Sequence, residues 1–183
     1  MEVKVIRGQK QIGGNIKEIS TGSTRILLDI GLELYDEKNK ELPEIDGLFN
    51  YKGYDAIFVS HYHSDHLGLA YLAYKDIPLF IGEASAKIIQ ASDAYKGTET
   101  VHPAGYLKHK QKITISDIYL TPFLCDHSAF DSYMLLCESA GERILYTGDF
   151  RSNGRKPYEG LLHELPSRVD KLICEGTTLS RTG

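Results

Sequence analysis

The sequence has 183 residues, which suits one domain, and its 42% of hydrophobic residues is enough for a sizeable core. The net charge of −4 gives no electrostatic support, at the level of the whole chain, for a nucleic-acid partner. No window approaches the roughly 18 uninterrupted apolar residues of a membrane span, and the start has no apolar signal segment, so we expect a cytoplasmic protein without membrane contact. The three cysteines are an odd number without C-x-x-C spacing, which argues against a disulfide framework.

The first half of the chain begins as sheet. Short β-branched strand patterns, separated by glycine turns, are expected at residues 2–6, 15–20 and 24–30. The charged segment 36–50 is interrupted by Pro43 and predicts a surface excursion with one helical turn. A strand, a helix, a second strand and a second helix then follow in order, at residues 54–60, 65–75, 77–82 and 83–96. A loop extends from there to about Leu107.

Strand patterns with tight connections dominate the second half. They cover residues 112–116, 118–125, 131–139 and 142–147. A short helix around 156–164 and a last strand over 169–176 follow. Strand runs on both sides of helical segments predict an α/β fold with two sheets covered by helices, in which loops at one edge carry the polar clusters.

The stretch SHYHSDHLG, residues 60–68, concentrates histidine directly after a hydrophobic strand pattern. His61 and His63 are two positions apart, so in an extended segment both imidazoles project to the same side, whereas Asp65 and His66 enter the next turn from another direction. The alternative is a polar turn in which Ser64 or Asp65 caps the helix. A cap needs only one such residue, so we favour two ligand sets that face a shared cavity.

Two further polar residues stand at strand ends, where groups of a functional site tend to gather. His127 follows the strand pattern that ends near residue 125, and Asp149 follows Gly148 just beyond the strand at 142–147. Imidazoles with carboxylates suit zinc, with manganese or iron as alternatives, and Asp149 is the natural candidate to bridge two cations. Two divalent cations would activate a water for hydrolysis of a phosphoryl or acyl group. Their charge also offsets the acidic composition, which therefore does not exclude a phosphate substrate.

The segment HYHSDH resembles the H-x-H-x-D-H motif of the metallo-β-lactamase superfamily. The resemblance implies an αββα sandwich with two metal ions at one edge, Asp149 bridging them, and Asp29 as an early strand-end aspartate that orients the loop. Without the motif, Asp29 reads equally well as a turn residue before Gly31. The implied ligands are His61, His63 and His127 for one metal, and Asp65, His66 and Asp149 for the other.

The segments QIGGNIKEI, DHSAFDSY, ILYTGDFR and LICEGTTLSR are similar to the beta-CASP branch of this superfamily, which includes ribonuclease J. The resemblance implies hydrolysis of phosphodiester bonds in RNA or DNA and gives Glu175 a role near the site. The alternative for Glu175 is an exposed acid that caps a turn. Arg151 and Arg155 follow the TGDF segment and are candidates to contact a phosphate; the alternative is solvated surface. Asp65 is expected to orient and deprotonate the attacking water.

The chain departs from the beta-CASP pattern at its C-terminus. Members of that branch continue into a nucleic-acid-clamping domain and then return to complete the sandwich with a further histidine, whereas here the sequence stops at Gly183 and no histidine follows His163. We therefore expect residues 1–183 to be the N-terminal portion of a metallo-β-lactamase-like domain, incomplete at its C-terminus, without the beta-CASP domain. A partial sandwich exposes a sheet edge, so formation of a homo-oligomer is also expected.

Three functions remain open at this point. The leading hypothesis is a metal-dependent nuclease that processes or degrades RNA or another single-stranded nucleic acid. The second is a metallohydrolase of small acyl substrates such as thioesters or lactones, which would use the same ligands because fold and metals do not fix the substrate. The third is a metal-binding module without catalysis, which the missing C-terminal segment would favour.

Overall fold

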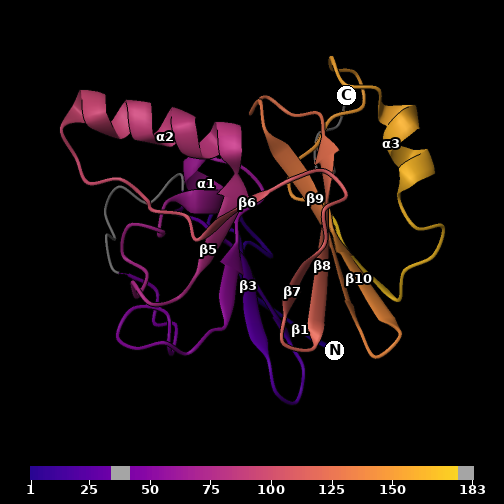
Figure 1. The fold of residues 1–183 in the computed structure, drawn as a ribbon, viewed down its shortest axis with the longest axis horizontal. Helices are drawn as coiled ribbons and strands as arrows, with labels where there is room; N and C mark the ends of the chain where they lie inside the picture. Colours follow the sequence, from indigo (N-terminus) through magenta and orange to yellow (C-terminus); the bar gives the residue numbers. More distant parts are fainter. Residues whose placement is uncertain (34–41, 177–183) are drawn as a thin grey trace.

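A computed structural model describes residues 1–33 and 42–176 and contains two β-sheets that lie face to face between helices (Figure 1). One sheet has the order β1 (Glu2–Arg7), β2 (Ile16–Ser20), β3 (Arg25–Ile30), β4 (Ala56–Phe58), β5 (Leu79–Gly82) and β6 (Gly105–Leu107). The other has the order β11 (Lys171–Ile173), β10 (Glu142–Tyr146), β9 (Ser132–Ser139), β8 (Ile118–Cys125) and β7 (Ile113–Ile115). The helices are α1 (Ser64–Leu67), α2 (Glu83–Lys96) and α3 (Tyr158–Glu164).

The way the strands pair explains where the long connections fall. The first three strands pair antiparallel through short turns, and so do β7 to β10. The strands from β3 to β6 are parallel, as are β10 and β11. Parallel neighbours need crossover connections, so the chain leaves the sheets after β3, β4, β5 and β10, and the segments that follow β4, β5 and β10 contain the helices. Two of these segments carry the polar motifs.

Hydrophobic side chains fill the spaces between the four layers. Leu27 and Leu28 are neighbours in β3 and neither has exposed surface. Leu28 packs between the two sheets, whereas Leu27 packs on the outer face together with Ile89 of α2. On the far side, Leu161 of α3 packs on the outer face of the second sheet. Helices therefore cover both outer faces, which confirms the predicted αββα arrangement.

The predicted helix over residues 65–75 is wrong. Only the short α1 forms, and the chain then continues through turns. The Asp65 carbonyl, which would accept a hydrogen bond from Leu69 in a longer helix, instead accepts one from the Asn15 amide at 2.9 Å, and the Leu69 amide donates to Ile30 of β3 at 2.9 Å. The neighbouring strands therefore capture the groups that would have extended the helix. Gly31 permits this approach, because a Cβ at that position would lie 1.7 Å from the Asp65 carbonyl oxygen.

The structure differs from the expected elements at two further segments and agrees at a third. The strand β6 was expected to be loop, because its three residues show no alternation and it forms only by pairing with β5. Part of the excursion at 36–50 lies outside the described residues, and its described portion, 42–50, has a turn at 46–48 in place of a helix. The helix at 83–96 is confirmed and ends before Gly97, which has a left-handed φ of 68°.

No helix in the described ranges has both the length and the apolar character needed to cross a bilayer.

Candidate metal centre

The histidine loop, residues 59–63, connects β4 to α1, and the Asp29 carboxylate anchors it through hydrogen bonds. One carboxylate oxygen of Asp29 accepts a hydrogen bond from the Ser60 amide at 2.7 Å, and the other accepts one from the Ser60 hydroxyl at 2.9 Å. Asp29 itself has a φ of 59°, a left-handed conformation that aspartate tolerates better than most residues. His63 has extended backbone angles, φ −64° and ψ 148°, the conformation in which side chains two positions apart project to the same side.

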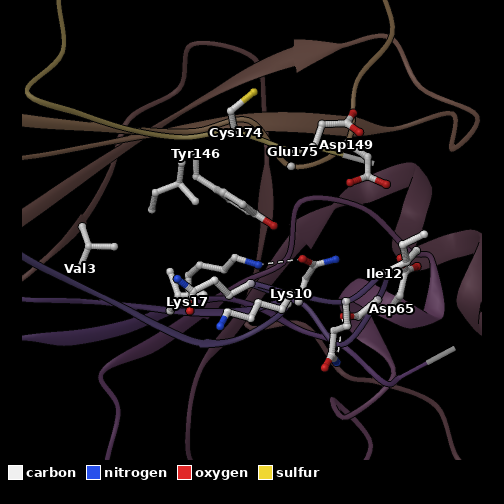
Figure 2. A pocket seen from close by; sticks show the side chains of 18 of the residues that line it. Val3, Lys10, Ile12, Lys17, Asp65, Tyr146, Asp149, Cys174 and Glu175 are labelled. Carbon is white, nitrogen blue, oxygen red and sulfur yellow. Dashed lines mark hydrogen bonds between the residues drawn. The ribbon is translucent and has the colours of Figure 1, made fainter. Parts of the chain in front are cut away.

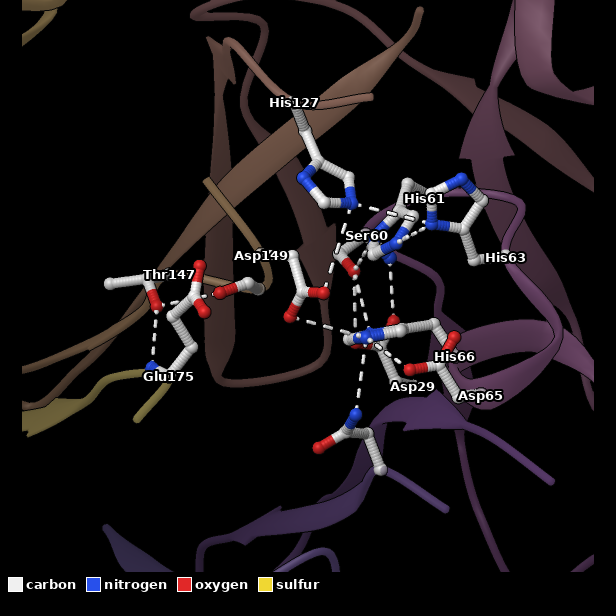
Figure 3. Close-up of polar contacts among 12 residues, drawn as sticks. Asp29, Ser60, His61, His63, Asp65, His66, His127, Thr147, Asp149 and Glu175 are labelled. Atoms are coloured by element: carbon white, nitrogen blue, oxygen red, sulfur yellow. Dashed lines mark hydrogen bonds and ion pairs between the residues drawn. The ribbon is translucent and has the colours of Figure 1, made fainter. Parts of the chain in front are cut away.

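His61, His63 and His127 form a first donor set (Figure 3). The Nε2 of His61 lies 3.2 Å from Nδ1 of His63, and Nε2 of His127 lies 3.3 Å from the same Nδ1. Four ligands at zinc–nitrogen distances of about 2.0–2.1 Å in a tetrahedron would be separated by about 3.3–3.4 Å. The three nitrogens therefore have the chemistry and the spacing that a zinc-like cation requires.

A second donor set contains His61, His66 and Asp149. Asp65 lies at its edge, with a carboxylate oxygen 3.6 Å from Nε2 of His66. Asp149 stands between the two sets: its Oδ1 is 3.3 Å from Nε2 of His66, and its Oδ2 is 3.7 Å from Nε2 of His127 (Figure 3). This is the arrangement that a carboxylate bridging two cations needs.

The His66 ring is fixed from behind. Its Nδ1 lies 2.7 Å from Oδ2 of Asp29, and the hydroxyl of Tyr146, from β10, donates a hydrogen bond to the same oxygen. A carboxylate behind a ligand histidine fixes both the tautomer and the direction of the ring. Asp29 thus contacts both the loop backbone and His66, from the strand-end position at which the sequence predicts an orienting role.

Burial and charge divide the histidines into two groups. Burial, with the neighbouring imidazoles, lowers the pKa of His61, and burial also lowers the pKa of His63 and His127. These rings are neutral near pH 7, as metal ligands must be. Burial also acts to lower the pKa of His66, but the carboxylates of Asp29 and Asp149 outweigh it and raise this pKa to about 10. Burial acts to raise the pKa of Asp149, but its hydrogen bond to His66 outweighs that effect and lowers it, so this carboxylate is charged.

Glu175 belongs to neither donor set. Its carboxylate accepts a hydrogen bond from the Phe150 amide at 2.8 Å, and its own amide donates to the Thr147 hydroxyl at 3.2 Å. Glu175 therefore fastens the end of β11 to the loop that carries Asp149 (Figure 3). Its contact beside Asp149 is thus with the backbone of Phe150.

Arg151 and Arg155, considered from the sequence as phosphate contacts, both bond to Asp126 in the structure. The guanidinium of Arg151 pairs with the Asp126 carboxylate, and the Arg151 amide donates to the Asp126 carbonyl at 2.8 Å. The Arg155 amide also donates to the Asp126 carboxylate, at 3.2 Å, while its side chain is exposed. Since Asp126 precedes His127, these bonds tie the Asp149 loop to the His127 loop.

A groove of about 1290 Å³ opens beside the donor sets, between the edge strands β1 and β11. Figure 2 shows Tyr146, Asp149 and Glu175 on one side of it, and Lys17 and Asp65 on the other. The groove is large enough for a nucleotide-sized ligand, since small-molecule sites commonly measure about 300–1,000 Å³.

Sequence reasoning did not find Asn15, Ser60 or Asp126, each of which contacts a residue of the site. Ser60 and Asp126 directly precede His61 and His127, so their places beside candidate ligands could have indicated that they lie near the site. Asn15 lies 51 positions before its partner His66, and only its place in the segment QIGGNIKEI pointed to it.

The family model for the beta-lactamase superfamily domain matches residues 24–181, most of the chain. The chain belongs to the beta-lactamase superfamily. The metallo-β-lactamase fold predicted from the histidine motif is confirmed by this match together with the two-sheet architecture. A crystal structure of an Enterococcus faecalis V583 protein of unknown function superimposes with a TM-score of 0.86 at 25% identity, over 99% of this chain and 51% of that one.

Curated relatives within the superfamily point to the predicted branch. The chain is 30% identical over 199 residues to the Probable RNase MJ4 of Methanocaldococcus jannaschii, covering 97% of this chain and 45% of the relative. It is 26% identical over 161 residues to Ribonuclease J of Helicobacter pylori, covering 82% of this chain and 23% of the relative. Membership of the beta-CASP branch is thereby confirmed. The chain spans less than half the length of these relatives.

These relationships support a hydrolase. The fold and the donor sets together indicate that the protein binds divalent metal.

Proposed function

We propose that the chain forms the hydrolytic core of a metal-dependent ribonuclease. The observation that carries this proposal is the position of Asp149, which directs one carboxylate oxygen at His66 and the other at His127. When bound, two divalent cations in such a site would activate a water and neutralise charge on a phosphodiester. Zinc is favoured by the nitrogen-rich first donor set, with manganese and iron as alternatives.

The proposed function assigns the residues of the site three roles: metal ligand, proton acceptor and support of the Asp149 loop. His61, His63 and His127 would hold one cation, and Asp65, His66 and Asp149 the other. The Asp65 carboxylate borders both His66 and the groove, and so is suited to accept a proton from the attacking water. Glu175 would act through the backbone of Phe150, by keeping the Asp149 loop in place.

The arginines fit different parts in this scheme. Arg151 is committed to Asp126 and would hold the His127 and Asp149 loops together. Arg155 has an exposed side chain beside the same loop, so it is the arginine that we propose contacts a phosphate of the substrate. RNA is the proposed substrate because the curated relatives carry the names of ribonucleases.

Cleavage of labelled single-stranded RNA by the purified protein, loaded with Zn²⁺ or Mn²⁺, tests the proposal. His63→Ala is expected to abolish cleavage, because it removes the nitrogen that lies within 3.3 Å of both other histidines of the first set. His163→Ala, at an exposed position of α3, is the matched control and should leave the rate unchanged. Loaded protein that leaves RNA and DNA intact but hydrolyses acyl esters would overturn the proposal in favour of an acyl hydrolase.

A further inference from the structure

Phe130 is the most exposed phenylalanine of the chain. All six phenylalanines lie in the described ranges, and five of them are buried or half-buried, whereas Phe130 is 69% exposed. It stands three positions after His127, in the loop that joins β8 to β9. A single exposed apolar residue is ordinary on a protein surface, so its meaning depends on how the residue is held and on what surrounds it.

The loop around Phe130 is anchored on both sides of the ring. Ala129 has no exposed surface, and Asp131 is only 7% exposed. The Asp131 carboxylate accepts hydrogen bonds from two backbone amides at the start of α2, at 2.9 and 3.1 Å. The Phe130 carbonyl accepts another from the Lys156 ammonium at 2.6 Å. The backbone therefore holds an exposed ring between two buried neighbours, so little ordering of the loop is needed when a ligand packs on that ring.

The segment 151–156 places positive charge beside the Phe130 loop. It carries Arg151, Arg155 and Lys156 and no carboxylate. Arg151 is paired with Asp126, whereas the Arg155 side chain is exposed. The Lys156 ammonium lies 5.6 Å from the centroid of the Phe130 ring. An exposed aromatic ring beside cations is the combination that binds single-stranded nucleic acid, because bases stack on the ring and the cations attract phosphates.

Asp126 links this ring to the metal centre. It directly precedes His127, and its carboxylate accepts the backbone amides of Arg155 at 3.2 Å and Lys156 at 3.0 Å. The Lys156 side chain then bonds to Phe130. The arginine proposed to contact a phosphate and the exposed ring therefore belong to one bonded set of loops, next to a ligand of the first donor set. A strand whose phosphate lies at Arg155 carries its bases on the neighbouring surface, where Phe130 stands.

We propose that Phe130 is a stacking platform for one nucleobase of a single-stranded RNA substrate. This inference deepens the proposed function and rests on it, because it takes RNA as the ligand. Every base has a π face, so the platform accepts any of the four bases and reads no base edge. Phe130 contacts the substrate away from the reacting atoms in this scheme, and it therefore contributes to affinity for RNA.

Stopped-flow anisotropy with the Zn²⁺-loaded protein tests the platform, because it records binding before cleavage proceeds. The probe is a fluorescein-labelled oligouridine of about ten nucleotides, the scale of known single-strand sites. Phe130→Ala is expected to weaken binding by about tenfold, and Phe130→Trp, which keeps an aromatic face, should stay within about threefold of the parent chain. Tyr95→Ala is the matched control and should change nothing, because Tyr95 is an exposed aromatic residue at the other end of α2 from Asp131.

Oligonucleotides that lack one base at a time separate stacking from a general effect on the surface. With the parent chain, removal of the base that occupies the platform should weaken binding by about tenfold, and removal of bases outside the site should not. The same removal should cause no further loss in Phe130→Ala, because the two changes delete the same contact.

The platform is overturned if Phe130→Ala binds the intact oligouridine as tightly as the parent chain, or if its loss is undiminished with every base-deleted oligonucleotide. Should Phe130→Ala not fold, the parent chain decides, since equal binding of all base-deleted oligonucleotides also contradicts the platform. A change of assembly state in light scattering with unchanged RNA affinity would make the ring a protein contact and overturn the platform. A parent chain that binds no RNA overturns the proposed ribonuclease function as well, whereas RNA binding that ignores Phe130 overturns the platform alone.

Discussion

Tyr146 of β10 donates its hydroxyl to the carboxylate of Asp29 at the end of β3, and thereby joins the two sheets beneath the histidine loop. The same carboxylate oxygen faces Nδ1 of His66. Tyr146→Phe removes one hydrogen bond to a buried charged acceptor. We expect the free energy of unfolding to fall by about 1.5–3 kcal/mol.

Urea denaturation measures this loss. Tyr119→Phe is the control, because Tyr119 is 43% exposed on β8, and it should change the stability by less than about 0.5 kcal/mol. Equal effects of the two substitutions would show that the bond to Asp29 contributes nothing specific.

Gly31 tests the contact that ends α1 early. A Cβ at this position would lie 1.7 Å from the Asp65 carbonyl oxygen, so Gly31→Ala must push the motif loop away from β3. We expect a loss of about 3 kcal/mol or more in unfolding free energy, together with weaker metal binding. Gly22→Ala is the control, since a Cβ there meets nothing within 4 Å. Thermal unfolding of the two variants side by side measures the difference, and a stable Gly31→Ala protein would contradict the described geometry.

The two donor sets should respond differently to pH. The pKa of His66 is raised to about 10, so the second cation must displace a proton throughout the neutral range. Its affinity should therefore rise by about tenfold per pH unit between pH 6 and pH 8. The pKa values of His61, His63 and His127 are lowered, so the first set is already deprotonated and its affinity should change much less. Zn²⁺ titrations across this range measure both slopes, and equal slopes would be inconsistent with this charge distribution.

The sequence predicted those parts of the fold and site that depend on local order. The helix at 83–96 could be read from its apolar spacing and Gly97, and the pairing of His61 with His63 follows from two-residue spacing in an extended segment. The prediction of a helix at 65–75 was wrong because the Asp65 carbonyl and the Leu69 amide bond to Asn15 and Ile30 instead of to each other. These partners are distant in the sequence, so no local pattern reveals them.

The contacts that hold His66 could not be predicted from the sequence, because the residues that make them are distant from it along the chain. Asn15 lies directly before β2 and Tyr146 lies in β10, both far from His66 along the chain, and neither residue type by itself indicates a role at the site. Glu175 was placed near the site by its motif, but its bond to the Phe150 amide depends on how β11 lies beside β10.

The central claim is that Asp149 joins two metal sites, and counting metal tests it most directly. After exposure to excess Zn²⁺ and removal of loosely held ions, plasma mass spectrometry of the parent chain should find two zinc ions per molecule. Asp149→Asn should retain one, held by His61, His63 and His127. Asp170→Asn is the control, because this carboxylate lies outside both donor sets and accepts a hydrogen bond from the Arg143 amide at 2.7 Å, and it should retain two. A parent chain with one zinc or none, or an Asp149→Asn protein that keeps two, would contradict the account.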